Sequence, residues 1–311
     1  FGSLLRKRAH VYDLTADGID VALGPSEPEQ PPSEPFSLKP PLDIVLDRVK
    51  VGHVRVTQAG KPVFESNSLD LAGSWTDAGI ALKSFALRAP DGRADLGGTL
   101  AVGDGYKGDG KASFRWKLGD IDYAGDVEAH SDGAKAHTIV KLSLPFVAQV
   151  DANLVQSGDY AWNASIDAPR FDPTPLLGEG TLTSLGLALK GSGDRYSADL
   201  TGDVDLNDYR VRLTPIKAAF DHEYKRLTLD ELTIGSPQVK GTLTAKGTVE
   251  IAAQPVAADL ALRWKEVLVP ANVAGQDLAT AGQLRFKGSA DAYHADGDVD
   301  IGPPGNIGKF T

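Results

Sequence analysis

The sequence has no cysteine and no methionine among its 311 residues. Without cysteine, the chain cannot form a disulfide framework, a thiolate metal site or a cysteine nucleophile. No run of residues approaches the roughly 18 to 20 consecutive apolar residues of a membrane-spanning helix, and no secretory signal pattern can be read at the start. We therefore expect a segment of a longer protein, with any membrane anchor outside this chain.

Basic residues are also scarce relative to acidic ones. The chain carries 32 Lys and Arg against 42 Asp and Glu, a formal net charge of -10. Binding to a phosphate backbone rests on a surplus of Lys and Arg, so we expect no nucleic-acid partner.

Glycine and proline, in contrast, are abundant, with 34 and 19 residues, and they predict many turns. Residues 1–23 are interpreted as an edge β segment in which Ile19, Val21 and Leu23 alternate. Residues 24–41 form a Pro/Glu-rich segment, interpreted as a solvated loop because proline removes backbone donors and favours extended conformations. We expect residues 42–311 to form one continuous, repetitive β structure.

The dominant pattern after Pro41 has a period of two, which is typical of strands with one buried face. The phase slips between Leu46 and Val49 and again before Val54, as bulges or short turns would cause. A run from Val140 to Leu154 keeps one phase across Pro145 and predicts either one bent strand or two. Other runs are Phe114 to Leu118, Leu185 to Leu189, Leu200 to Leu206, Leu243 to Ile251, Leu260 to Trp264 and Val299 to Ile301. Only two short stretches fit a helix, around Thr174 to Leu177 and Asn272 to Leu278, so the expected class is all-β with little helix.

Gly and Asp pairs separate these runs and favour tight turns with positive φ, so most neighbouring strands should be antiparallel. The predicted turns are at Asp91-Gly92, Asp104-Gly105, Asp109-Gly110, Asp132-Gly133 and Gly158-Asp159. Two stretches also resemble each other, Ile80 to Leu118 and Leu227 to Leu268, and a second pair begins at Leu187 and at Leu284. Such repetition predicts an array in which each unit buries its face against its neighbours.

The glycine-rich stretch around Gly105 resembles two nucleotide-binding motifs. Gly103, Gly105 and Gly108 match G-x-G-x-x-G, and Gly105 to Ala112 comes within one residue of a P-loop with Lys111 in the lysine position. Both motifs need a helix directly after the loop to hold phosphate, whereas an alternating strand follows here. We interpret the stretch as a hairpin turn and expect no nucleotide cofactor.

No other pattern predicts catalysis. Asp296, Asp298 and Asp300 lack the glycine and the distal glutamate of a calcium loop, and at strand spacing they would line one solvated face opposite Val299 and Ile301. The histidines lie far apart in sequence and none completes H-E-x-x-H, although folding could bring some together. There is no G-x-S-x-G elbow and no distinct acid/base pair. We expect no catalytic residues, no metal and no cofactor, so the chain should not be an enzyme.

The apolar alternation itself has two interpretations. The inward faces could pack against one another as the closed core of a sandwich. Alternatively, the array could stay open along one side, so that its apolar face is covered by another molecule. Burial stabilises by roughly 25 cal/mol per Å² whichever molecule covers the surface, so periodicity cannot choose between them.

A family resemblance favours the open form. The stretch PPLDIVLDRVKVGHVRVTQ after an acidic Pro-rich loop, the repeated GTL…RWK unit and LALKGSGDRYSADL resemble the TamB family of AsmA-like bacterial envelope proteins, from about Val11 to the end of the chain. The likeness places the chain in the amino-terminal to middle portion of a longer member. It implies an elongated β-taco, a curled sheet forming a U-shaped groove with a hydrophobic interior open along one seam.

The resemblance also implies a function. The full-length protein would be tethered to the inner membrane, lie in the periplasm and move phospholipid between the two membranes. Its partner would be an outer-membrane protein of the TamA type, bound through a carboxy-terminal region outside this chain. The alternative implied function is a scaffold or chaperone role in outer-membrane protein assembly by the translocation and assembly module, with strand edges pairing with client strands. Under the lipid hypothesis, the expected groove lining comprises Phe114, Trp116, Leu142, Leu144, Leu187, Leu189, Leu200, Leu243, Leu260, Leu262 and Phe286.

Overall fold

The structure is a computed structural model that describes residues 7–24, 39–101, 106–269, 271–289, 291–305 and 308–310. It is nearly all β, which confirms the expected class. The chain divides into two compact units, Phe1–Ser157 and Gly158–Thr311. Most of the Pro/Glu-rich segment, residues 25–38, lies outside the described residues, as do Gly103, Asp104 and Gly105.

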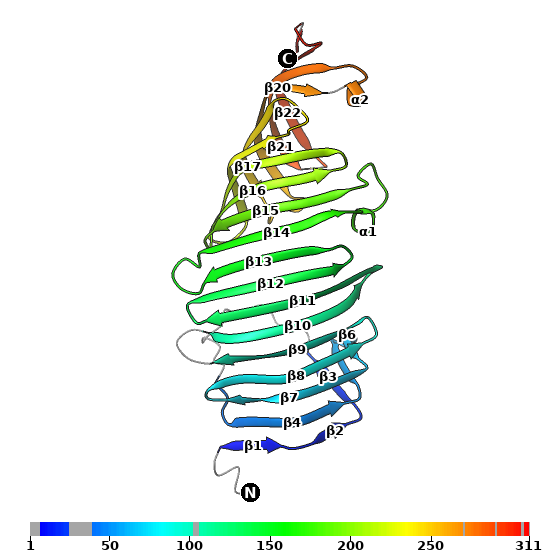
Figure 1. The fold of residues 1–311 in the computed structure, drawn as a ribbon, viewed down its shortest axis with the longest axis vertical. Helices are drawn as coiled ribbons and strands as arrows, with labels where there is room; N and C mark the ends of the chain where they lie inside the picture. The colour runs from blue at the N-terminus through cyan, green and yellow to red at the C-terminus, as the bar shows by residue number, and fades with distance from the viewer. Residues whose placement is uncertain are drawn as a thin grey trace. The chain divides into compact units, whose positions relative to one another are not determined.

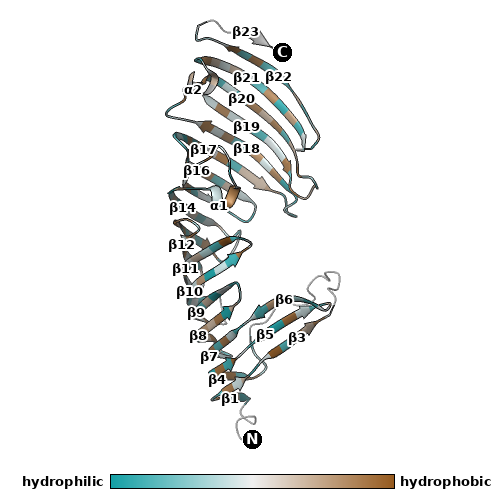
Figure 2. Cartoon of the chain, turned by 90° about the vertical axis from the view of Figure 1, so that its right-hand side faces the viewer, coloured by the Kyte–Doolittle hydropathy of each residue, from teal (hydrophilic) through white to brown (hydrophobic). Residues whose placement is uncertain are grey.

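Unit 1 consists mainly of antiparallel strands in chain order (Figure 1). Its strands are β1 (Arg8–Val11), β2 (Leu14–Ala16), β3 (Ile19–Leu23), β4 (Asp43–Val51), β5 (Val54–Gln58), β6 (Lys61–Ser66), β7 (Ser68–Thr76), β8 (Gly79–Ala89), β9 (Gly92–Ala101), β10 (Lys107–Leu118), β11 (Ile121–Asp132), β12 (Lys135–Leu144) and β13 (Ala148–Val155). The edge segment contributes β1 and β2, which pair in parallel with β4. It also contributes β3, which pairs in parallel with β5 in a separate sheet of three strands, β3, β5 and β6. Figure 2 shows this small sheet standing apart from β7 to β11, and β6 contacts β8.

Unit 2 is a single antiparallel meander. Its elements are β14 (Trp162–Phe171), α1 (Thr174–Leu177), β15 (Leu185–Gly193), β16 (Ser197–Leu206), β17 (Tyr209–Phe220), β18 (Arg226–Gly235), β19 (Thr242–Glu250), β20 (Ala257–Val269), α2 (Ala271–Ala274), β21 (Leu278–Ser289), β22 (Tyr293–Gly302) and β23 (Gly308–Phe310). The first predicted helix is confirmed as α1. The second is shorter than predicted and lies earlier, because β21 begins at Leu278 and takes up the end of the predicted range.

The strands are long and curved, as Figure 2 shows for β18 to β22. Register shifts recur along them, for example at Leu82/Phe85, Leu213/Ile216 and Trp264/Val267. An extra residue on one strand of a pair bends the strand and increases its twist, so these bulges curl each sheet. The predicted phase slip after Leu46 is one of these shifts, and a turn at Gly52 and His53 separates β4 from β5.

Two local predictions resolve differently. The run across Pro145 forms two strands, β12 and β13. The predicted turn at Asp109-Gly110 is wrong, because Lys107 to Ala112 lie within β10 and pair with β9 and β11. Gly108 serves close strand approach here rather than a turn, because a Cβ on it would lie 2.0 Å from the carbonyl oxygen of Thr99.

The two repeat pairs correspond to repeated strand groups. The stretch from Ile80 to Leu118 forms β8 to β10, and the stretch from Leu227 to Leu268 forms β18 to β20. Each group is a three-stranded antiparallel meander. The second repeat pair covers the hairpins β15–β16 and β21–β22. The repeating element is therefore a short run of antiparallel strands rather than a closed domain.

Candidate functional site

Unit 1 carries an apolar face built from cross-strand rows. Residues that pair directly across antiparallel strands point to the same side of a sheet, so the register defines each row. One row crosses β4 and β7 to β13 and consists of Val51, Leu69, Leu87, Ala94, Phe114, Gly125, Leu142 and Ala148. The adjacent row consists of Val49, Leu71, Phe85, Leu96, Ala112, Val127, Val140 and Val150.

Unit 2 carries a face of the same kind. One row crosses β14 to β22 and consists of Ile166, Leu189, Gly202, Leu213, Ile234, Leu243, Trp264, Gly282 and Val299. A second row consists of Ala164, Gly191, Leu200, Ile216, Leu232, Ala245, Leu262, Leu284 and Gly297. Leu260 and Phe286 pair directly with each other in a third row, and Leu187 lies two residues from Leu189 on the same face.

Ten of the eleven predicted lining residues lie on these apolar faces. Phe114, Trp116, Leu142 and Leu144 belong to unit 1. Leu144 is the exception, because a register shift pairs it with Ala124, which pairs with Arg115 of the polar face. The other seven belong to unit 2. Apart from Leu144, the register therefore brings each set together on one side of its sheet. Contact with lipid remains a prediction for all eleven.

Neither face is covered as a closed core would be. Among the described residues, the buried hydrophobic core is small and consists of Val49, Val51, Ala148, Ala168 and Ala245, with Val49 7% exposed. The eleven larger lining residues are all only half-buried. In a closed sandwich, large inward-facing leucines and aromatics are the most fully buried residues. The structure therefore favours the open interpretation of the alternation.

Tryptophans on the faces lie against glycines of adjacent strands. A Cβ on Gly282 would lie 2.5 Å from Cζ2 of Trp264, and a Cβ on Gly92 would lie 2.8 Å from Cδ2 of Trp116. The indole therefore covers the glycine and fills the space that a side chain would take. The Trp264 Nε1 group donates to Oγ1 of Thr280 at 3.0 Å, so this indole adds no unpaired donor to the face.

Glycines also open a hollow in the apolar face of unit 1. Its volume is about 300 Å³, and Gly98 and Gly110 lie among its lining. A Cβ on Gly110 would have no atom within 4 Å, so this glycine borders open space. The apolar side chains around the hollow are Ile80, Leu82, Leu96, Leu100, Val127 and Ala129. Sequence reasoning missed this feature, although Gly108 and Gly110 stand in phase with Ala112, Phe114 and Trp116.

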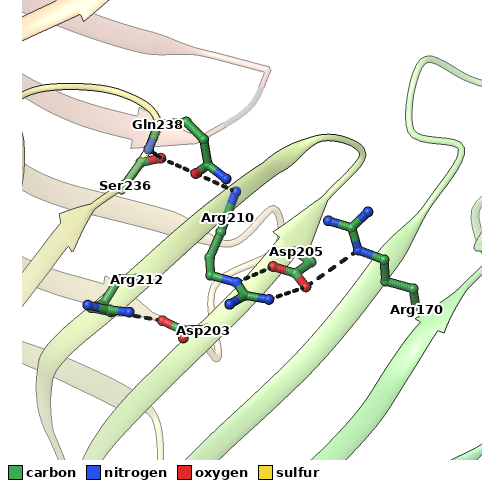
Figure 3. Close-up of polar contacts among 7 residues, drawn as sticks. All are labelled: Arg170, Asp203, Asp205, Arg210, Arg212, Ser236 and Gln238. Carbon is green, nitrogen blue, oxygen red and sulfur yellow. Dashed lines mark hydrogen bonds and ion pairs between the residues drawn. The ribbon is translucent and has the colours of Figure 1, made fainter.

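The opposite faces are polar and carry ion pairs between strands. In unit 2, Arg210 donates to both carboxylate oxygens of Asp205, at 2.7 and 2.9 Å, and Arg212 donates to Asp203 at 3.0 Å (Figure 3). Arg170 reaches the same Asp205 from β14, passing over Gly186 of the intervening strand. Hydrogen bonds from Arg210 hold the pKa of Asp205 below the ordinary value of 3.8. Further pairs on these faces include Arg88–Asp95, Lys111–Glu128, Lys217–Glu231, Arg226–Glu250 and Arg285–Asp259.

The polar faces contain the motifs that could have suggested a metal. Asp296, Asp298 and Asp300 alternate with Val299 and Ile301 along β22, as predicted, and pair with Arg285, Gln283 and Ala281 of β21. Folding brings His130 opposite His137, but they bind different carboxylates, Asp109 at 2.6 Å and Asp151 at 3.1 Å. Within the described ranges, no group of three His, Asp or Glu residues is arranged to hold a metal ion.

The nucleotide-motif residues that can be placed, Gly108, Lys111 and Ala112, lie in strand β10. No helix in the described part of the chain is long and apolar enough to cross a bilayer.

Comparison with known proteins adds no relative. No family model matches the chain, and neither a curated protein nor a solved structure matches it. The resemblance to the TamB family therefore rests on the sequence motifs alone.

Proposed function

We propose that the apolar faces of the two units bind the acyl chains of phospholipids, and that the chain is a segment of a TamB-type conduit moving phospholipid across the periplasm. One observation carries the proposal: rows of large apolar side chains continue across many strands and remain half-buried. Covering such a surface releases roughly 25 cal/mol per Å², so an apolar ligand is the cover that these faces favour.

The chemistry of the faces favours hydrocarbon over peptide. The strand amides are paired in the ladders, and the Trp264 indole donates within its own sheet. A client strand lying on the face would bring amide groups that find no partner there, and burying an unpaired amide is costly. An acyl chain carries no such group. A chaperone role would instead use strand edges, for example that of β3, whose Ile19, Val21 and Leu23 side chains are exposed.

The proposal requires no catalysis. Acyl chains would lie against leucine, isoleucine, valine and aromatic side chains, and charged headgroups would stay in water because burying an unpaired charge costs far more than burying methylene gains. Anchoring in the inner membrane and binding to a TamA-type partner belong to the same proposal, through regions outside this chain.

Photocrosslinking at alternating positions tests the proposal. A photoreactive residue at Leu262, on the apolar face, should capture phospholipid in the cell envelope, and one at Arg263, on the polar face, should not. Phe114 and Arg115 form the matched pair in unit 1. Because successive strand residues point to opposite faces, the paired positions differ in side but hardly in location.

Three outcomes are informative. Lipid adducts confined to Leu262 and Phe114 support the proposal. Equal lipid capture at both phases would contradict it, because the apolar face would then have no special role. Protein adducts along β3, with no lipid adducts on either face, would instead favour the chaperone role.

A further inference from the structure

The two ends of the strands in the unit 2 sheet carry different side chains. The start of β14, the connections β15–β16, β17–β18 and β19–β20, and the start of β22 all lie at one end of the strands, because the strands form an antiparallel meander. We call this set of strand ends and connections the aromatic edge. Its exposed large side chains are Tyr160, Tyr224, Ile251, Val256 and Tyr293. At the other end of the strands, Leu177 of α1 is the exposed large hydrophobic residue among those described.

Arg195 lies within a cluster of tyrosines on the aromatic edge. Its Nε donates to the hydroxyl oxygen of Tyr224 at 3.3 Å, and that hydroxyl donates to the Arg195 carbonyl at 3.2 Å. The guanidinium carbon lies 5.4 Å from the ring centre of Tyr196. No carboxylate in the described part of the chain forms an ion pair with it. The guanidinium is therefore held in place by neutral groups and keeps its charge unpaired.

The acidic residues nearby are engaged elsewhere. The Asp194 carboxylate accepts hydrogen bonds from the backbone N–H groups of Tyr196 and Ser197, at 2.8 and 2.9 Å. The Asp221 carboxylate accepts one from the Lys225 backbone N–H at 2.7 Å. Glu223 pairs with the Lys225 ammonium at 2.6 Å. Asp159 contributes its backbone carbonyl, which accepts from the Arg195 backbone N–H at 2.8 Å.

Two of the tyrosines have unusual backbone conformations. Tyr160 has φ 56° and Tyr224 has φ 55°. Bulky residues rarely adopt positive φ, and such outliers occur at functional sites where the surrounding structure holds them. Glycine or asparagine would fit these turns with less strain, yet the Tyr224 turn places the phenol hydroxyl against Arg195.

The cluster borders the apolar face directly. The indole N–H of Trp162 donates to the Asp194 carbonyl at 3.0 Å, and the ring lies over Gly191 beside Leu200 of the apolar face. Phe220, on the same side as Ala218 and Leu229, contacts Tyr224 with ring centres 6.0 Å apart. A ligand bound at Arg195 could therefore extend an apolar tail across Trp162 toward Leu200.

We propose that Arg195, with Tyr196 and Tyr224, binds the phosphate of an amphiphile whose acyl chain lies on the apolar face of unit 2. A guanidinium fork matches the geometry of phosphate oxygens, and hydrogen bonds to charged groups are stronger than those between neutral groups. The aromatic rings suit the boundary between an apolar chain and a wet headgroup. This inference rests on the proposed function and adds a headgroup anchor to it.

A matched pair of ligands tests the anchor. Decyl phosphate and decyl maltoside share one tail, and only the first carries a phosphate. Calorimetric titration of the whole chain, below the micelle concentration of each ligand, should show tighter binding of decyl phosphate. Arg195→Gln should weaken decyl phosphate binding about tenfold and leave decyl maltoside binding unchanged. Arg195→Lys, which keeps the charge but loses the fork, should give an intermediate loss.

Arg263→Gln is the control variant, because Arg263 lies exposed on the polar face of β20 and should affect neither ligand. A structural role of Arg195 would lower thermal stability in Arg195→Gln without separating the two ligands, and that result would overturn the anchor. Equal binding of decyl phosphate by the wild type and Arg195→Gln would also overturn the anchor. If decyl maltoside still binds, the proposed binding of an acyl chain by the apolar face is unaffected. Failure of both ligands to bind the wild type would overturn the groove and the anchor together. Inorganic phosphate that binds as tightly as decyl phosphate, and is lost in Arg195→Gln, would identify a free phosphate as the ligand instead.

Discussion

Tryptophan and glycine act as a pair on the apolar faces. Trp264 faces Gly282 across β20 and β21, and Trp116 faces Gly92 across β10 and β9. The missing side chain leaves space into which the indole lies, so a large residue does not protrude far from the sheet. Under the proposed function, this would allow an acyl chain to lie across many strands without meeting a protruding ring.

Substitution of Gly282 should show how much stability depends on the packing of Trp264 against this glycine. Gly282→Ala places a Cβ 2.5 Å from Trp264 Cζ2 and from the Asp298 carbonyl oxygen, so the indole or the strand must move. We expect a loss of about 1–3 kcal/mol in the free energy of unfolding, measured by urea denaturation. Gly110→Ala is the matched control, because its Cβ would meet no atom within 4 Å. There the loss of glycine flexibility should leave stability unchanged or raise it by about 0.5–1 kcal/mol. Equal losses in the two variants would contradict the packing argument.

The side on which individual residues lie could be predicted from the sequence in most places. Alternation placed ten of the eleven candidates on the apolar faces, because each stands within a run that keeps its phase. Leu144 is the exception, because a register shift separates it from Leu142. It could not predict the Arg195 cluster. Arg195, Tyr160 and Tyr224 come from three different connections, and only the meander brings these connections to one edge. The residues of such a site follow no repeating pattern along the sequence.

The sequence signals that predicted bulges and turns were not equally reliable. Phase slips at Leu46 to Val49 correctly indicated a bulge, because an inserted residue must shift the alternation. The Asp109-Gly110 pair misled because glycine also occurs inside strands, and here Gly110 lies within β10 and borders the hollow in the apolar face. The better signal was that Gly110 alternates in phase with Ala112 and Phe114, because a turn would interrupt this alternation.

Ion pairs across the polar faces should stabilise strand pairing in a pH-dependent way. Asp205 is the clearest case, with a side chain 15% exposed between two arginines (Figure 3). Its pKa is lowered in the folded chain by hydrogen bonds from Arg210. A lowered folded pKa contributes stability above the ordinary aspartate value of 3.8, and this contribution disappears as the pH falls through the folded pKa.

Asp205→Asn should therefore destabilise the chain by about 1–2 kcal/mol at neutral pH, and the difference from wild type should shrink below about pH 4. Urea denaturation across this range measures both values. Arg210→Gln should show the same trend, and the double variant should lose less than the sum of the single losses because the two residues share one interaction. A difference from wild type that is independent of pH would contradict this role.

At the scale of the molecule, each unit combines a continuous apolar face with a polar face carrying ion pairs. The all-β class, the repeated meanders and this two-sidedness could be predicted from period and turn residues, since they repeat along the whole chain. Whether the apolar faces stay open could not, because a period of two is the same in a closed core and in a groove. The resemblance suggested the open form, and the half-buried side chains of the structure favour it.

If the apolar faces bind lipid as proposed, the stability of the chain should depend on the lipid concentration. A molecule that binds the folded chain and not the unfolded one stabilises it by mass action, by about 2.7 kcal/mol at a hundred times its dissociation constant. We expect a short-chain phospholipid, added below its micelle concentration, to raise the midpoint of thermal unfolding. The rise should increase with the concentration of the free phospholipid.

Leu262→Asp should remove much of this rise, because the new carboxylate lies between Ala245 and Leu284 on the apolar face and would be buried by the ligand. Ala261→Asp is the matched control. It lies one residue away on the polar face, between Lys246 and Arg285, where an added carboxylate finds cations. A phospholipid that raises the midpoint equally in both variants would show that it binds elsewhere, because only one substitution changes the face on which the acyl chain is expected to lie.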